Sequence, residues 1–271
     1  MIRSLRSEIA KLWSMPGMWV VLLLAFPLTG LFVLLAFLQA GNHAFPSSTF
    51  AHVQTLGDRR ILLGSGFRMA TLLAPLVGVL CVTTEYRHKT ITSTLLLTPQ
   101  RSRVLGAKVV TTAIWCVGMT FISFVAVAAI GLPWNSGMGG TIGSVLDQAG
   151  AVVPEVLLAT VLLGLFGLGF GTLVKNQIAG VLVTIGGTLI LEQLIVGIIK
   201  VTTHYSLNWL PNEATAAFVG TISKGQGFGG SGGGNNVFQL LPWWLGGIVM
   251  LGWGLGPLAI GYFTTFRKDV T

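Results

Sequence analysis

Residues 152–174 read VVPEVLLATVLLGLFGLGFGTLV, an apolar run with a single charged residue, Glu155. A helix of about 20 predominantly apolar residues is long enough to cross the hydrocarbon core of a bilayer. The run therefore predicts a membrane-spanning helix. The whole composition agrees, because only 9% of the 271 residues are charged, whereas a soluble domain carries roughly 25%.

Five further stretches have a similar character, and the shortest of them contains Pro75. Proline is tolerated in a membrane helix where neighbouring groups satisfy the freed carbonyl. We expect an all-α membrane protein with a single transmembrane domain, residues 1–271. The six spans are predicted at about 19–38, 69–84, 104–132, 152–174, 178–199 and 243–266.

Residues 2–15 differ in pattern from the span that follows them. Their apolar residues recur at helical spacing, and their cations fall on other faces. This predicts an amphipathic helix that lies in the membrane interface. A basic start before an apolar run also occurs in signal peptides. Here the run is too long and no small-x-small cleavage site follows, so a retained helix is expected.

Lysine and arginine are distributed unequally over the predicted loops. With a cytoplasmic N-terminus, the inner segments hold eleven cations and the outer segments five. The positive-inside rule then predicts a multi-pass protein of the cell membrane with both termini cytoplasmic. Residues 201–242 become an extracellular loop that contains a flexible Gly/Ser/Asn tract, 225–236. The moderately apolar segment 205–220 is compatible with short helices that return into the membrane.

Sequence signatures of catalysis are absent. There is no G-x-x-x-x-G-K-[ST] nucleotide loop, and the four histidines lack metal-ligand spacing. Cys81 and Cys116 lie in apolar runs, which favours buried thiols over a disulfide scaffold. The net charge of +8 is assigned to inner membrane loops, so nucleic acid is not expected as a partner. We expect no enzymatic activity on this chain.

Glu192 is the only acidic residue clearly inside a predicted span. Two interpretations stay open: it faces a polar groove or a neighbouring group, or it contacts a substrate. Gly167 and Gly171 form a small-xxx-small pair, which lets two helix backbones approach closely. That close approach fits packing within the chain or an interface between subunits.

Residues 84–108 read TEYRHKTITSTLLLTPQRSRVLGAK. A charged head is followed by a short apolar and hydroxyl-rich helix that ends at Pro99. A plain inner loop does not require Ile91, Leu95 and Leu96 at near-helical spacing. That spacing favours a short helix that docks into a groove on a cytosolic partner.

This segment resembles the one that follows the second helix in ABC-2 type transporter permeases. Lys89 stands where those permeases usually have glycine. The resemblance extends over the whole chain, from the amphipathic start to the long last outer loop. The residues that match the pattern are Glu85, Thr90, Ile91, Leu95, Leu96, Pro99, Arg101 or Arg103, and Lys108.

The resemblance implies a permease subunit. Two such subunits, identical or related, would pair with two separate ATP-binding subunits, which hold the ATP and magnesium; no cofactor is expected here. Segment 85–103 would be the coupling helix on the ATPase. The family mostly exports drugs, antibiotics, lipids, peptides or polysaccharides. The predicted coupling residues are Glu85, Arg87, Lys89, Thr90, Ile91, Leu95, Leu96, Pro99 and Arg101.

The same resemblance places the substrate pathway at a two-fold interface, between the second and fifth helices. The fifth helix mixes small and polar residues where a lipid-facing helix is uniformly apolar. A secondary transporter and a non-transporting membrane assembly factor are the alternatives. The first predicts several buried ionisable groups, and the second leaves the coupling-like segment unexplained. The predicted pathway residues are Met69, Leu72, Thr184, Thr188, Glu192 and Gln193.

Overall fold

The computed structural model of the chain describes residues 2–40, 66–88, 101–137, 142–174, 176–203, 209–219 and 242–266. These residues are helical almost throughout and none of them lies in a strand, which confirms the predicted all-α class. In chain order the elements are α1 (Ile2–Ser14), α2 (Pro16–Ala40), α4 (Arg68–Arg87), α6 (Arg101–Gly137), α7 (Ile142–Leu173), α8 (Gln177–Val181), η1 (Leu182–Leu191), α9 (Glu192–Thr203), α10 (Pro211–Val219), α11 (Trp243–Gly261) and η2 (Tyr262–Phe266).

Within the described residues, six helical stretches are long and apolar enough to cross a membrane, as the sequence predicts. The second extends past its predicted end, since α4 continues beyond Thr84 to Arg87. Glu85 therefore lies in the last turn of a membrane helix. The six stretches are Pro16–Leu35, Arg68–Arg87, Ser102–Pro133, Val152–Leu173, Gln177–Ile199 and Trp243–Thr264.

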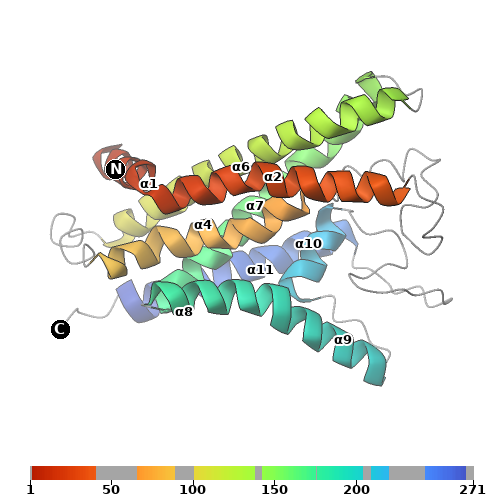
Figure 1. Ribbon diagram of the computed structural model, residues 1–271. Coiled ribbons are helices and arrows are strands. Elements are labelled where there is room, and N and C mark those ends of the chain that lie inside the picture. Colours follow the sequence, from red (N-terminus) through yellow and green to blue (C-terminus); the bar gives the residue numbers. More distant parts are fainter. Residues whose placement is uncertain are drawn as a thin grey trace.

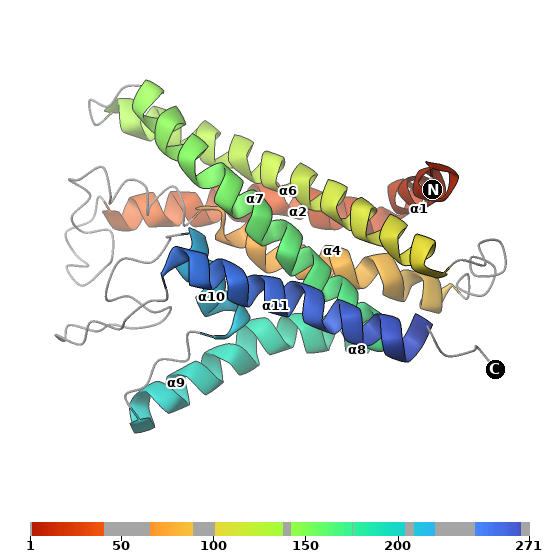
Figure 2. The same cartoon turned by 180° about the vertical axis from the view of Figure 1, so that it is seen from behind.

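Helix α7 lies at the centre of the bundle and packs against α4, α6 and α11 (Figures 1 and 2). Its glycines set the closest approaches. A Cβ atom on Gly167 would overlap the backbone of Pro75 in α4, and one on Gly171 would lie 3.1 Å from the carbonyl oxygen of Val79. The small-xxx-small pair thus serves packing within the chain, which confirms one of its two interpretations.

The fifth span is built differently from the others. It begins as α8, widens into the π-helix η1 and continues as α9, which diverges from the bundle (Figure 1). Thr184 and Thr188 bond back to the carbonyls of Gly180 and Thr184. Most of the large apolar side chains of this span are exposed, so it offers an apolar surface to lipid or to another chain.

The predicted outer loop 201–242 is partly helical. Helix α9 runs to Thr203, and α10 packs against α7 and α11. From Ala214 to Val219 every residue of α10 is buried, in agreement with a short helix that returns into the bundle. The tract 225–236 lies outside the described residues.

The bundle has two distinct ends (Figure 1). Helix α1, the last turn of α4, the first turn of α6 and η2 lie at one, which we call the α1 end. The start of α4, α10 and the start of α11 lie toward the other, the α10 end. The helix predicted over 2–15 is observed as α1, while its position relative to a membrane stays a prediction.

Candidate functional site

At the α1 end, four charged side chains from three helices form a closed set that we call the charge ring: Glu8 and Lys11 of α1, Glu85 of α4, and Lys108 of α6. Lys108 Nζ lies 2.9 Å from Glu8 Oε2 and 2.9 Å from Glu85 Oε1. Lys11 Nζ lies 2.9 Å from Glu8 Oε1 and 3.0 Å from Glu85 Oε1. Each cation therefore contacts both carboxylates.

Three members of the charge ring are buried, Lys11 is partly exposed, and the charges balance. The side chains of Lys108, Glu85 and Glu8 are 1%, 2% and 4% exposed. A charge removed from water is costly unless an opposite charge and hydrogen bonds compensate it. Lys108 Nζ also donates to the carbonyl oxygen of Cys81, at 3.3 Å. Two cations facing two carboxylates explain how α6 accommodates a lysine inside its span.

The two α1 members of the ring have shifted pKa values. Burial raises the pKa of the Glu8 carboxyl, but attraction and hydrogen bonding by Lys108 and Lys11 outweigh it, and the net pKa lies below its ordinary 4.5. Burial lowers the pKa of Lys11, but the hydrogen bond to Glu8 and the charge of Glu85 prevail, so it rises above 10.5. Both groups are therefore held charged at neutral pH.

Aromatic side chains also hold α1 against its neighbouring helices. The ring centroids of Trp19 in α2 lie 4.8 Å from Trp13 in α1 and 5.5 Å from Trp115 in α6. Trp19 Nε1 donates to the carbonyl oxygen of Trp13 at 2.8 Å. Helix α1 is thus held to α2 and α6 by aromatic contacts, and to α4 and α6 by charge.

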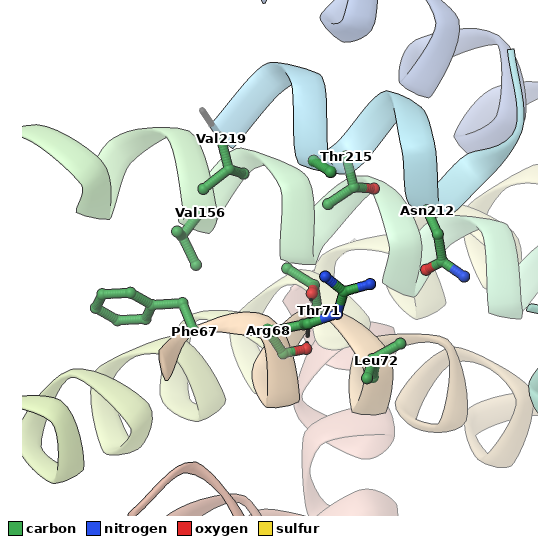
Figure 3. A pocket seen from close by; sticks show the side chains of 9 residues that line it. Phe67, Arg68, Thr71, Leu72, Val156, Asn212, Thr215 and Val219 are labelled. Carbon is green, nitrogen blue, oxygen red and sulfur yellow. Dashed lines mark hydrogen bonds between the residues drawn. The ribbon is translucent and has the colours of Figure 1, made fainter. Parts of the chain in front are cut away.

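A second polar site lies toward the α10 end, around a cavity of about 20 Å³ between α4, α7 and α10. In Figure 3 the guanidinium group of Arg68 points from the start of α4 toward α10. A space of this size holds a water molecule. The lining residues are Phe67, Arg68, Thr71, Leu72, Val156, Asn212, Thr215, Ala216 and Val219.

Glu192 connects the fifth span to α10 beside this cavity. Its Oε1 accepts from the backbone N–H of Asn212 at 2.7 Å and of Glu213 at 3.4 Å. Asn212 Nδ2 in turn donates to the carbonyl oxygen of Thr188 at 2.6 Å. A carboxylate at a helix N-terminus satisfies free N–H groups and complements the helix dipole. Of the two interpretations of Glu192, pairing with a neighbouring group is the one observed.

The family model described as ABC-2 family transporter protein matches residues 4–191, more than half of the chain. The chain belongs to the ABC-2 transporter family. That membership supports a permease component of an ABC transporter. The search of curated proteins found no match.

The structure describes only some of the predicted coupling residues of this ABC-2 permease. Glu85 belongs to the charge ring, and Arg87 Nη1 donates to Gln177 Oε1 at 3.1 Å. Arg101 opens α6, and only its backbone is described. The residues outside the described part of the chain are Lys89, Thr90, Ile91, Leu95, Leu96 and Pro99.

The predicted pathway residues gather in part at the α10 end. Leu72 lines the cavity, while Thr188 and Glu192 both contact Asn212, another lining residue. Thr184 is buried and bonded within its own helix. Met69 and Gln193 are partly exposed and do not line the cavity. The structure therefore brings together three of these six residues.

Sequence reasoning missed Glu8 and Asn212. Glu8 lies four residues before the buried Leu12, so both point to one helix face. That spacing is a signal that an acidic side chain is directed inward. Asn212 is the second residue of α10, and nothing in the sequence pattern indicates its bond to Thr188.

Proposed function

We propose that the chain is the membrane permease subunit of an ATP-driven exporter. Two copies, or this chain and a related one, pair with two ATP-binding subunits that hold the ATP and magnesium. The cargo is a drug, antibiotic, lipid or peptide. Segment 85–103, which joins the end of α4 to the start of α6, contains the coupling helix. The second and fifth helices line the pathway at a two-fold interface.

The observation that carries this proposal is the position of the charge ring. Glu85 lies four residues before segment 89–100 and Lys108 lies eight residues after it. The 2.9 Å pair between them, together with Glu8 and Lys11, ties both flanks of the segment to α1. A displacement of the segment by ATP binding on a partner is thereby passed to α4, α6 and α1 together.

Helix α4 connects the α1 end to the α10 end and can transmit such a displacement between them. Glu85 and Arg68 are separated by 17 residues, or about 26 Å along a helix. Arg68 and Leu72 line the cavity against α10, and Glu192 connects α10 to the fifth span. A shift of α4 at the α1 end therefore changes the contact between the two helices proposed to line the pathway.

Buried ionisable groups are also expected of a secondary transporter. In this chain Glu8, Lys11, Glu85 and Lys108 are paired with one another at one end of the bundle. Glu192, the first residue of α9, lies toward the opposite end and accepts from the backbone N–H of Asn212 in α10. The buried charges therefore fit a role in holding helices together better than a role in proton transfer through the membrane. This agrees with the family match.

The test replaces Leu95 and Leu96 with aspartate in a tagged chain. The matched control is Ser93→Asp with Thr94→Asp, which at helical spacing lies on the opposite face. Co-purification of an ATP-binding chain should be lost in the leucine variant and kept in the control, with equal membrane insertion. Equal recovery of that chain by both variants would reject this docking surface.

A further inference from the structure

A second cavity, of about 410 Å³, lies at the α1 end where the second and fifth spans meet. Its walls are the last turn of α4 and the first residues of α8, two elements in direct contact. It is separate from the charge ring, since Glu85 is directed toward Lys108. The lining residues are Tyr86, Arg87, Asn176, Gln177 and Ile178.

The lining is rich in hydrogen-bond donors and contains no carboxylate. Arg87 bonds to the neutral amide oxygen of Gln177, and among the described residues it has no acidic partner, so its positive charge is retained. Asn176 Oδ1 accepts from the N–H groups of Ile178 and Ala179, which leaves its NH₂ group for an acceptor. A guanidinium, a phenol and two amides favour an anion with several oxygens.

The depth of the cavity narrows the choice of anion. Arg87 is the last residue of the second candidate span, and Gln177 is the first residue of the fifth. This is the level of lipid headgroups. Just inside it, Ile178 and Leu182 are 72% and 65% exposed, an apolar surface that suits an acyl chain.

We propose that this cavity binds the phosphate group of an anionic phospholipid, with an acyl chain along the exposed face of the fifth span. Basic pockets between membrane helices are known to hold such headgroups. Arg87 carries the charge recognition, and the Asn176 amide and the Tyr86 hydroxyl supply further donors. The proposal does not require transport by the chain, although Arg87 is also one of the predicted coupling residues.

The experiment is native mass spectrometry of the full chain in detergent, titrated with phosphatidylglycerol. Arg87→Gln should need at least about five-fold more lipid to reach the same bound fraction, as expected for loss of one cation at a membrane surface. The matched control is Arg103→Gln, an exposed arginine in the first turn of α6 at the same end. It should titrate like the unchanged chain.

Two further measurements test whether the bound phosphate belongs to an anionic lipid. Phosphatidylcholine, which has the same phosphate but no net charge, should bind more weakly than phosphatidylglycerol and show little dependence on Arg87. Inorganic phosphate should not displace the bound lipid. Equal titrations of the Arg87 and Arg103 variants would overturn the site, and displacement by inorganic phosphate would overturn its assignment to a lipid.

Discussion

Lys108 shows at the scale of a residue how a charge is kept inside a membrane helix. A lysine at the centre of a bilayer span costs about 2.5–3.5 kcal/mol on insertion scales. Here the side chain has two carboxylates at 2.9 Å and a backbone carbonyl at 3.3 Å. Its charge belongs to a balanced group of four, so removal of one member leaves the others uncompensated.

We therefore expect Lys108→Met to destabilise the fold by about 3–5 kcal/mol, the usual effect of breaking a buried pair. Methionine keeps approximately the length of the lysine side chain, so the loss of stability is due mainly to removal of the charge. Thermal unfolding in detergent is the measurement. Adding Glu8→Gln and Glu85→Gln to the variant should recover part of the loss. Arg103→Met, at an exposed position of α6, is the control; an equal melting temperature for the two single variants would contradict the charge ring.

The shifted pKa values of Glu8 and Lys11 predict how α1 responds to pH. The pKa of Glu8 is lowered on folding, so its stabilising effect is present above pH 4.5 and is lost as the pH falls through the lowered value. The pKa of Lys11 is raised, so its effect is present below pH 10.5 and is lost as the pH rises through the raised value. Docking of α1 should be strongest between these limits.

Spin labels at the exposed positions Ser14 and Ser102, with Cys81 and Cys116 replaced by alanine, measure this docking. The distance distribution between the labels should stay unchanged from about pH 5 to 9 and broaden in stronger acid. Glu8→Gln should remove that acid transition, since it has no carboxyl to protonate. An acid transition that persists in Glu8→Gln would assign it to another group.

At the scale of an element, α10 depends on a residue from outside its own sequence. The first N–H groups of a helix lack partners within it. Glu192, twenty residues earlier in the chain, accepts from Asn212 and Glu213. Since α10 packs on α7 and α11, this carboxylate joins the fifth span to the central bundle.

Glu192→Ala should loosen α10, whereas Glu192→Gln should not, because the glutamine amide oxygen still accepts from Asn212 and Glu213. Loss of this acceptor costs about 1–3 kcal/mol, which corresponds to about 5-fold to 150-fold in the opening equilibrium. A cysteine at the buried Thr215, with Cys81 and Cys116 replaced, should react with a maleimide faster by such a factor in the alanine variant. Equal rates in the two variants would show that Glu192 does not hold α10.

The elements differ in how far the sequence predicts them. The six spans follow from composition, because a long apolar run has few alternatives to a membrane helix. The contacts among Glu8, Glu85 and Lys108 do not follow from composition. These three residues are 23 to 100 positions apart in the sequence and meet only after α1, α4 and α6 pack. Gly167 and Gly171 are intermediate: their spacing predicts a close helix contact, but only the fold shows that α4 is the partner.

At the scale of the whole molecule, lysine and arginine are distributed unequally over the predicted loop segments. Eleven lysines and arginines fall in the predicted inner segments and five in the outer ones. Lys11 and Lys108 are paired with carboxylates in the charge ring, and without these two the inner segments still hold nine cations against five. The α1 end is therefore the one that the positive-inside rule assigns to the cytoplasm.

This orientation makes a prediction about residues 220–241. They join the end of α10 to the start of α11, and both of these lie toward the α10 end (Figure 1). With Cys81 and Cys116 replaced by alanine, a cysteine at Ser231 should react with a membrane-impermeant maleimide in intact cells. A cysteine at Ser102, in the first turn of α6 at the α1 end, should react only after the cells are permeabilised. The opposite pattern would place α1, the charge ring and segment 85–103 outside the cell. No cytosolic ATPase could then reach that segment, so the same experiment also tests the proposed coupling.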